Sequence, residues 1–495
     1  MNKKAAFIFN IIIILLFTVL FGSCKSTDAN ENNPGNTNQT TISDNNAVEA
    51  ETTETTETTE IPDNLPEMDF GGYDFRIYIR DQEHYNTDFH AESETGDLIN
   101  DAVYTRNKKV EERFNISIDT IFYPLNDNLT SVSKSILAGD DAYDVIAMHG
   151  AYAFAFGAEI AIDWFSNMPY INFDAPWWPE DIVKNLSAFG KLYCTTGDIS
   201  YLGLNSSGCM MFNKDLFKNL GIDYPYEDVL NGKWTTDKFM SIVKSGMLDL
   251  DGDGVMSPSS DRYGVDIFNE WGYPITVFYS GGDRVITINA DGTPELTVYN
   301  ERTSNIFDKF FDLINSGGAY VRPTGGGGEF IENTSFKSGR ALILATVVSD
   351  IIRHRDLDYE VGVLPYPKYD ENTPKYYANP DAGQNVLVIP KTVSDTEKIS
   401  IIIEALAAES YRSVMPAFYE VSLKTKYSRD EESEAMLDYI RDGIIFDYGY
   451  FNSSVAGDLA YIGRNLYASK NPNFLSYYEK WAPKAEENIK KLSDN

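Results

Sequence analysis

The sequence predicts an α/β protein of two lobes that follows a secretory leader and a polar linker. Three features support this prediction: an apolar run near the N-terminus, a long polar stretch behind it, and alternating strand and helix patterns in the rest of the chain. This remainder is about 425 residues long, which is more than one ordinary hydrophobic core accommodates. We therefore expect two lobes.

Residues 1–23 have the features of a lipoprotein signal peptide. Two lysines at positions 3 and 4 precede an almost unbroken apolar run, which ends in Leu20-Phe21-Gly22-Ser23-Cys24. Small residues directly before a cysteine predict cleavage before Cys24 and lipid attachment to its thiol. Phe21 departs from the leucine that is usual at this position. The alternative is an uncleaved membrane helix, for which the run lies at the short end of the spanning range.

Residues 24–68 are predicted to form a disordered acidic tether. Asn, Thr, Ser, Asp and Glu dominate this stretch, which contains the repeat TTETTETTE from Thr52 to Glu60. So few apolar side chains cannot offset the entropy lost on folding. We expect this segment to hold a folded body clear of a membrane.

Beyond residue 68 the patterns alternate between strand and helix. Strands are expected at 75–79, 116–122 and 143–148, with helices at 97–114 and 129–138 between them, an order that predicts parallel strands. Later strands are expected at 191–195, 209–212, 284–288, 341–348, 359–364 and 385–389, and later helices at 213–220, 237–247, 303–315 and from about 398 onward. We place lobe 1 at 69–205 and lobe 2 at 206–375, and we assign 376–495 to a return to lobe 1 and to C-terminal helices shared by both lobes.

Charge and cysteine content narrow the possible functions. The formal net charge is −34, whereas nucleic-acid binding needs a basic surface, so no nucleic-acid partner is expected. Self-repulsion of this kind favours a soluble monomer. Besides Cys24 the chain has Cys194 and Cys209. They are either two buried thiols or a disulfide, and with no histidine nearby they do not make a zinc site.

Several short segments carry a family resemblance. They are 96–118 (GDLINDAVYTRNKKVEERFNISI), 211–222 (MFNKDLFKNLGI), 232–237 (GKWTTD), 336–342 (FKSGRAL), 361–368 (VGVLPYPK) and 386–391 (VLVIPK). In this order they resemble the extracellular solute-binding proteins of carbohydrate ABC importers, family 1 type, and in particular their Gram-positive lipoprotein branch. The resemblance implies a two-lobed periplasmic-binding-protein-like fold of type II that captures a carbohydrate, expected to be an oligosaccharide, in an interlobe cleft without catalysis. It also implies an ABC permease as partner and a lipid-anchored location on the outer face of the cytoplasmic membrane.

An aspartate-rich segment predicts a calcium site. In residues 249–255 (DLDGDGV), Asp249, Asp251 and Asp253 alternate with other residues as in the first half of a calcium loop, and the backbone carbonyl of Val255 would be a further ligand. Position twelve of such a loop is a serine here, and Asp261 comes one residue late. The sequence therefore leaves open which residue is the last calcium ligand. The expected cofactor is a structural Ca²⁺ ion. The alternative is an acidic surface turn.

Aromatic and polar residues near predicted strand ends are the candidates for a sugar site, because sugars pair apolar ring faces with hydroxyl groups. The expected aromatic platforms are Trp177, Trp178, Trp271 and Tyr273. The expected polar contacts are His149, Asp198, Asn379 and Asp381, which lie close to strand ends.

Two other functions remain open from the residues alone. One is the binding of a peptide or a polyamine. The other is an anchored glycoside hydrolase, which needs two carboxylates at a set separation. Turnover of an oligosaccharide would identify the hydrolase.

Overall fold

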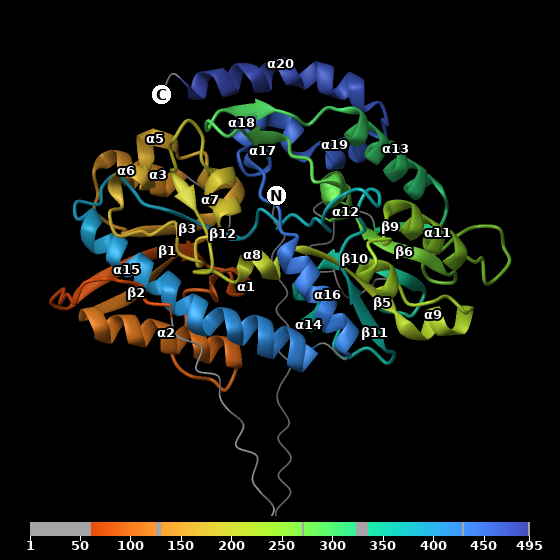
Figure 1. Ribbon diagram of the computed structural model, residues 1–495, viewed down its shortest axis with the longest axis horizontal. Coiled ribbons are helices and arrows are strands. Elements are labelled where there is room, and N and C mark those ends of the chain that lie inside the picture. The colour runs from red at the N-terminus through yellow and green to blue at the C-terminus, as the bar shows by residue number, and fades with distance from the viewer. Residues whose placement is uncertain (1–60, 125–129, 270–271, 323–334, 428–429, 494–495) are drawn as a thin grey trace, which may run out of the picture. The chain divides into compact units, whose positions relative to one another are not determined.

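The computed structural model describes residues 61–124, 130–269, 272–322, 335–427 and 430–493, and Figure 1 shows how their elements are arranged. The first sheet has the order β2-β1-β3-β12-β4. Its strands are β1 (Tyr73–Arg80), β2 (Ile116–Tyr123), β3 (Val145–His149), β4 (Cys194–Thr195) and β12 (Asn385–Val388). In Figure 1 it combines strands drawn in red to yellow with one drawn in cyan, because the chain returns to it late.

The second sheet has the order β11-β5-β10-β6-β9. Its strands are β5 (Gly208–Asn213), β6 (Tyr263–Phe268), β9 (Ala319–Arg322), β10 (Ala341–Val347) and β11 (Val361–Leu364). A separate hairpin pairs β7 (Ile286–Ile288) with β8 (Pro294–Leu296).

Helices fill the connections between the strands. Up to β5 they are α1 (Glu83–Asn86), α2 (Leu98–Phe114), α3 (Thr130–Ala138), α4 (Gly150–Ala153), α5 (Gly157–Ile160), α6 (Trp164–Asn167), α7 (Glu180–Leu186) and α8 (Leu202–Asn205). Between β5 and β12 they are α9 (Lys214–Leu220), α10 (Tyr226–Leu230), α11 (Thr236–Gly246), α12 (Tyr273–Thr276), η1 (Val277–Gly281), α13 (Glu301–Asn315) and α14 (Ser349–Arg353).

The C-terminal part is helical, as the sequence predicts. Its elements are α15 (Thr396–Glu409), the π-helical segments η2 (Ser410–Val414) and η3 (Ala417–Tyr427), α16 (Glu431–Asp442), α17 (Tyr448–Phe451), α18 (Ser453–Ala456), η4 (Gly457–Tyr461), α19 (Ile462–Ser469) and α20 (Phe474–Leu492). Among the described helices, none combines the length and the apolar character needed to cross a membrane.

Both sheets are mixed. β1 pairs in parallel with β2 and β3, as the alternation of strands and helices predicts. β12 runs antiparallel to β3 and β4, and β5 runs antiparallel to β10 and β11. These reversed strands follow or precede the points where the chain passes from one sheet to the other, so they do not belong to a simple βαβ repeat.

Two crossover segments carry the chain between the sheets, a third crossover joins two C-terminal helices, and the three segments hydrogen-bond side by side. The first leads from β4 to β5, the second from β11 to β12, and the third from α16 to α17. Asp381 N donates to Ser206 O at 3.0 Å, and Gly208 N donates to Asn379 O at 3.4 Å. On the other side, Ala378 N donates to Gly443 O at 3.0 Å. The second crossover therefore lies between the other two.

A buried aspartate fixes the third crossover. Asp447 accepts hydrogen bonds from Tyr279 Oη at 3.0 Å, Val285 N at 2.7 Å, Ile286 N at 3.2 Å and Gly449 N at 2.8 Å. These contacts join the start of α17 to η1 and to the hairpin of β7 and β8. Burial raises the pKa of Asp447, and the four donors oppose this rise.

The first described residues are clamped onto the body. Asp63 accepts from Arg113 Nη1 of α2 at 2.6 Å and from Arg113 Nη2 at 3.2 Å. Arg412 of η2 lies 3.7 Å from the same carboxylate and donates to Ile61 O at 2.6 Å. These contacts attach residues 61–63 to two helical elements rather than to a sheet.

Candidate functional site

The site forms where β1 and β3 end beside the second crossover. Gly150 N, directly after β3, donates to Gln384 O at 3.0 Å, and Ala151 N donates to Ala382 O at 3.3 Å. Arg80, the last residue of β1, donates from Nη2 to Gly383 O. The carboxyl ends of two parallel strands thus meet residues 382–384, at the edge of the sheet where α/β proteins bind ligands.

Asp381 is surrounded by tyrosines. Its Oδ1 accepts from Gly383 N at 2.6 Å, and burial raises its pKa. Burial also raises the pKa values of Tyr85, Tyr450 and Tyr461, and the nearby charge of Asp381 adds to each rise. The structure therefore brings one carboxylate and three phenol rings together from three distant parts of the chain.

Arg80 is a buried cation beside this group. Its guanidinium lies 3.7 Å from the centre of the Tyr85 ring, at cation–π distance. Burial lowers its pKa, while the charges of Tyr123, Tyr85, Asp88 and Asp381 partly restore it. Sequence reasoning missed Arg80 because it reads as the last residue of a strand rather than as part of a site.

His149 caps the helix that follows β3. Its Nδ1 accepts from Ala151 N at 3.2 Å, and its ring packs against Tyr152 at 4.8 Å between centroids. Burial, and then the charge of Arg80, lowers its pKa to about 3. The imidazole is therefore neutral at physiological pH, and it lies beside the group around Asp381.

Asn379 and Asp198 differ in their surroundings. Asn379 is buried in the second crossover, where Nδ2 donates to Pro380 O at 3.4 Å. Asp198 is half-buried; its backbone N donates to Trp177 O at 3.0 Å, and burial raises its pKa to about 7 against the charge of Arg441. Its backbone hydrogen bond thus goes to Trp177, and the charge that acts on its carboxyl group is that of Arg441.

The tryptophans of the 174–179 segment are core residues. The side chains of Trp177 and Trp178 are 1% exposed. Their indole Nε1 atoms donate to the two carboxylate oxygens of Glu404, at 2.9 Å and 2.8 Å. Neither tryptophan offers a free ring face to a ligand in this structure, contrary to the sequence prediction.

Tyr273 is also a core residue. It is buried, stacks on Tyr366 at 5.6 Å and packs against Phe239 and Phe310 at 5.9 and 6.1 Å. The proline-containing turn after Gly272 directs this ring into the second lobe, so the predicted platform role is wrong here as well. Trp271 lies outside the described residues.

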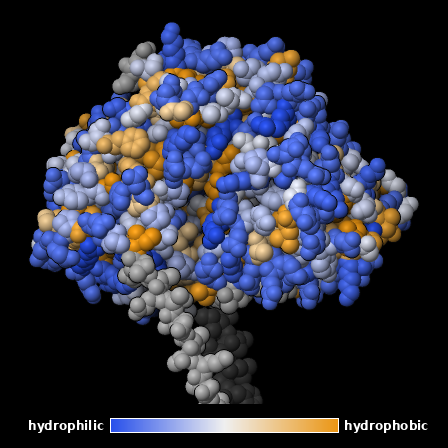
Figure 2. All heavy atoms as spheres, in the orientation of Figure 1, coloured by the Kyte–Doolittle hydropathy of each residue, from blue (hydrophilic) through white to orange (hydrophobic). Residues whose placement is uncertain are grey.

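Figure 2 shows hydrophobic residues gathered in a narrow strip near the centre of one face, with hydrophilic residues on both sides. The tyrosines described above are the aromatic residues that the sequence analysis missed. For Tyr450 and Tyr461 the signal is the stretch YGYFNSSVAGDLAY from Tyr448 to Tyr461, which holds three tyrosines and one phenylalanine. Only the fold shows that this stretch reaches Asp381.

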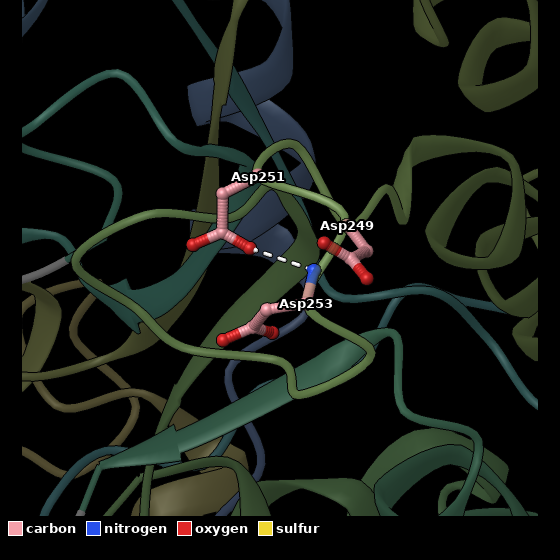
Figure 3. Close-up of side chains that lie close together, drawn as sticks. All are labelled: Asp249, Asp251 and Asp253. Carbon is pink, nitrogen blue, oxygen red and sulfur yellow. Dashed lines mark hydrogen bonds between the residues drawn. The ribbon is translucent and has the colours of Figure 1, made fainter.

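The aspartate loop forms a compact carboxylate cluster. One oxygen from each of Asp249, Asp251 and Asp253 lies within 4.8 Å of the others, and Figure 3 shows the three side chains around one turn of the loop. Asp251 Oδ1 accepts from Asp253 N at 3.2 Å, the dashed line in Figure 3. Gly252 and Gly254 have φ values of +74° and +81°, a conformation that favours glycine.

This donor set fits a hard cation such as Ca²⁺. The two oxygens of Asp249 accept from Gly252 N and Gly254 N at 2.7 and 2.8 Å, but a carboxylate oxygen has a second lone pair for a metal. Val255 is exposed at the end of the turn, so its carbonyl stays a predicted ligand.

Asp261 does not join the carboxylate cluster. It is 0% exposed, and its oxygens accept from Leu250 N at 2.8 Å and Ser257 N at 2.7 Å. The Leu250 bond is the main cause of its lowered pKa. Asp261 thus closes the loop through the backbone, which corrects its predicted role as a metal ligand.

Comparisons with known proteins agree with this architecture. The sequence pattern of the bacterial extracellular solute-binding protein family matches residues 99–407. No curated protein matches the sequence significantly.

Solved structures share the fold at low sequence identity. The GacH receptor of Streptomyces glaucescens, solved unliganded and with acarbose, has a TM-score of 0.53 and 11% identity over 85% of this chain and 97% of the receptor. A cyclo/maltodextrin-binding protein complexed with maltotetraose has a TM-score of 0.55 and 14% identity over 85% and 97%. A sugar transporter protein from Rhizobium etli in an open conformation has a TM-score of 0.55 and 13% identity over 85% and 99%. These likenesses confirm the two-lobed fold.

Acidification should destabilise the protein in part through His149. Its folded-state pKa of about 3 lies below the value of about 6.5 expected for the unfolded chain. The unfolded chain therefore takes up the proton first, and the free energy of unfolding falls as the pH drops below about 6.5. For one such group the loss between pH 7 and pH 5 is at most about 2 kcal/mol.

The test is urea unfolding at both pH values. His149→Asn keeps an acceptor for Ala151 N without a titrating ring, so it should lose less stability than the wild type. The exposed His84 provides the matched control, because His84→Asn should keep the wild-type difference. Identical pH dependence in the wild type and His149→Asn would contradict the prediction.

Proposed function

Because the chain belongs to the bacterial extracellular solute-binding protein family, we propose that it captures a carbohydrate between its lobes and delivers it to an ABC permease. The observation that carries this proposal is the group around Asp381, where a carboxylate, a buried arginine and three tyrosines meet at the strand ends. Hydroxyl groups suit such polar atoms, and the apolar faces of a sugar suit phenol rings. The ligand would be an oligosaccharide and the protein a monomer.

Proteins of the same fold that were solved with a bound ligand support the choice of a sugar. Two of the structures with the same fold were solved with acarbose and with maltotetraose. A peptide or a polyamine is the alternative ligand class. A glycoside hydrolase is the alternative activity, and it would consume the sugar that a binding protein releases intact.

The first experiment is a thermal-shift screen of the chain from Lys25 onward against mono- and oligosaccharides, peptides and polyamines. A ligand at 100 to 1,000 times its Kd should add about 2.7–4.1 kcal/mol and raise Tm by several degrees. Tyr461→Leu should reduce the shift. Tyr299→Leu should not, because Tyr299 packs on Tyr478 and Phe474 instead. Shifts with amines or peptides but with no sugar would overturn the carbohydrate proposal, and cleaved sugar would indicate the hydrolase.

We also propose a structural Ca²⁺ ion held by Asp249, Asp251, Asp253 and the carbonyl of Val255. The clustered carboxylates and the glycine turn support this assignment. A bound cation would neutralise the repulsion between three aspartates and so stabilise the second lobe.

Calcium added to chelator-treated protein should therefore raise Tm by several degrees, since the ion binds the folded loop. The double variant Asp251→Asn, Asp253→Asn should lose this response. Asp291→Asn, an acidic residue in the exposed turn between β7 and β8, should keep it. No calcium response in the wild type would leave the loop as an acidic surface turn.

We further propose that Cys24 carries a lipid and that residues 24–68 tether the body to the outer face of the cytoplasmic membrane of a Gram-positive cell. This proposal rests on the leader and the small residues before Cys24, which lie outside the described residues. Mass spectrometry of the protein extracted from the membrane fraction should show a chain that begins at Cys24 and carries a lipid on its thiol. A chain that still contains residues 1–23 and carries no lipid would instead indicate an uncleaved membrane helix.

A further inference from the structure

Several buried polar atoms converge on the second crossover without a partner. Arg80 Nε, Gln384 Nε2, Gln384 Oε1 and Asn379 Oδ1 have no hydrogen-bond partner among the described residues. Arg80 is 2% exposed, Gln384 0% and Asn379 5%. Buried polar atoms are nearly always hydrogen-bonded in folded proteins. Two donors and two acceptors left unpaired, three of them within residues 379–384 and one on Arg80 at the end of β1, therefore indicate a hydrogen-bonding ligand.

These atoms belong to one neighbourhood. Arg80 donates to Gly383 O, next to Gln384, and the Gln384 Oε1 atom lies 2.9 Å from the position of a Cβ on Gly203. Asp381, between Asn379 and Gln384, uses Oδ1 for Gly383 N at 2.6 Å.

The charges of this neighbourhood balance. Arg80 forms no ion pair within the described residues, and it is the cation that opposes the effect of burial on Asp381. The next acid, Asp88, already accepts from Ser200 and Asn385, at 2.6 and 3.0 Å. Arg353 pairs with Asp350 at 3.0 Å. One positive and one negative group therefore remain to face a ligand.

We infer that this group, comprising Arg80, Asn379, Asp381 and Gln384, binds an uncharged sugar ring and that the balance of Arg80 against Asp381 rejects uronic acids and amino sugars. The inference rests on the proposed function and narrows its substrate class. A hydroxyl both donates and accepts, so it satisfies adjacent unpaired donors and acceptors at once. A uronate would add a second anion beside Asp381, and an ammonium would add a second cation beside Arg80, and such pairs are costly where water is excluded.

The experiment is calorimetric titration of the mature chain with three compounds: the best neutral sugar and two charged analogues of it, its uronic acid and its 2-amino derivative. The wild type should bind the neutral sugar at least about 10-fold more tightly than either charged analogue. Asp381→Asn keeps an acceptor for Gly383 N and removes the negative charge. It should therefore improve uronate binding relative to neutral sugar by about 10-fold or more.

Two controls separate local charge from other effects. Asp223→Asn removes an exposed carboxylate elsewhere and should leave the ratio of the two dissociation constants unchanged. Arg80→Lys keeps the positive charge, so it should keep the rejection of the amino sugar even if it weakens all binding. Circular dichroism confirms that each variant is folded.

Three results would overturn the inference. The first is that the wild type binds a charged analogue as tightly as the neutral sugar, a result that needs no variant. The second is that Asp381→Asn leaves the ratio of the dissociation constants for the uronate and the neutral sugar as it is in the wild type, which would mean that the unpaired atoms hold only water. If no sugar of any charge binds while another solute does, the proposed function itself fails, and this inference fails with it.

Discussion

The hydrogen bonding of the three crossover segments is the constraint on which the candidate site depends. Residues 206–208, 378–381 and 443–445 lie side by side through backbone bonds of 3.0 to 3.4 Å. The second and third segments can approach this closely because residue 443 is a glycine: a Cβ on Gly443 would lie 1.7 Å from Tyr376 O. The pairing places Asp381 and Gln384 beside the ends of β1 and β3, and it brings the tyrosines after Asp447 to the same point. A site made from such distant residues exists only while these segments stay paired.

Burial rather than formal charge decides the chemistry of this site. The whole chain carries a net charge of −34, yet the crossover group contains one cation and one anion. His149 stays neutral because burial and Arg80 lower its pKa to about 3, so it contributes hydrogen bonding and ring surface without charge. The strongly acidic surface and the balanced interior are therefore independent properties, as expected when charges are exposed in one place and desolvated in the other.

The sequence predicted most strands of the two sheets and the helices α2, α3, α9, α11 and α13 to within a few residues, because hydrophobic periodicity and capping are local signals. It missed most of the short helices and the strands β8, β9 and β6, the last of which contains Gly264 and the buried Asp266. That glycine lets α11 approach the strand, since a Cβ there would lie 2.0 Å from Val243 O. The site was harder to predict. His149, Asn379 and Asp381 were chosen because they lie near predicted strand ends. Arg80 and Gln384 could be recognised only from the fold, because Arg80 contacts Gly383, the neighbour of Gln384, across 303 residues of chain. Trp177 and Trp178 were misjudged because their partner, Glu404, lies more than 200 residues away.

The clamp at Asp63 determines how the body bears mechanical load. Arg113 and Arg412 hold this aspartate and the Ile61 carbonyl against α2 and the π-helical turn. A force applied through the preceding chain is taken up there, as shear across several polar contacts that share it. The backbone of β1, which begins ten residues later at Tyr73 and ends in Arg80, is thereby shielded from tension. Pulling on residue 61 would therefore load contacts to α2 and η2 before it reached the end of β1 at Arg80.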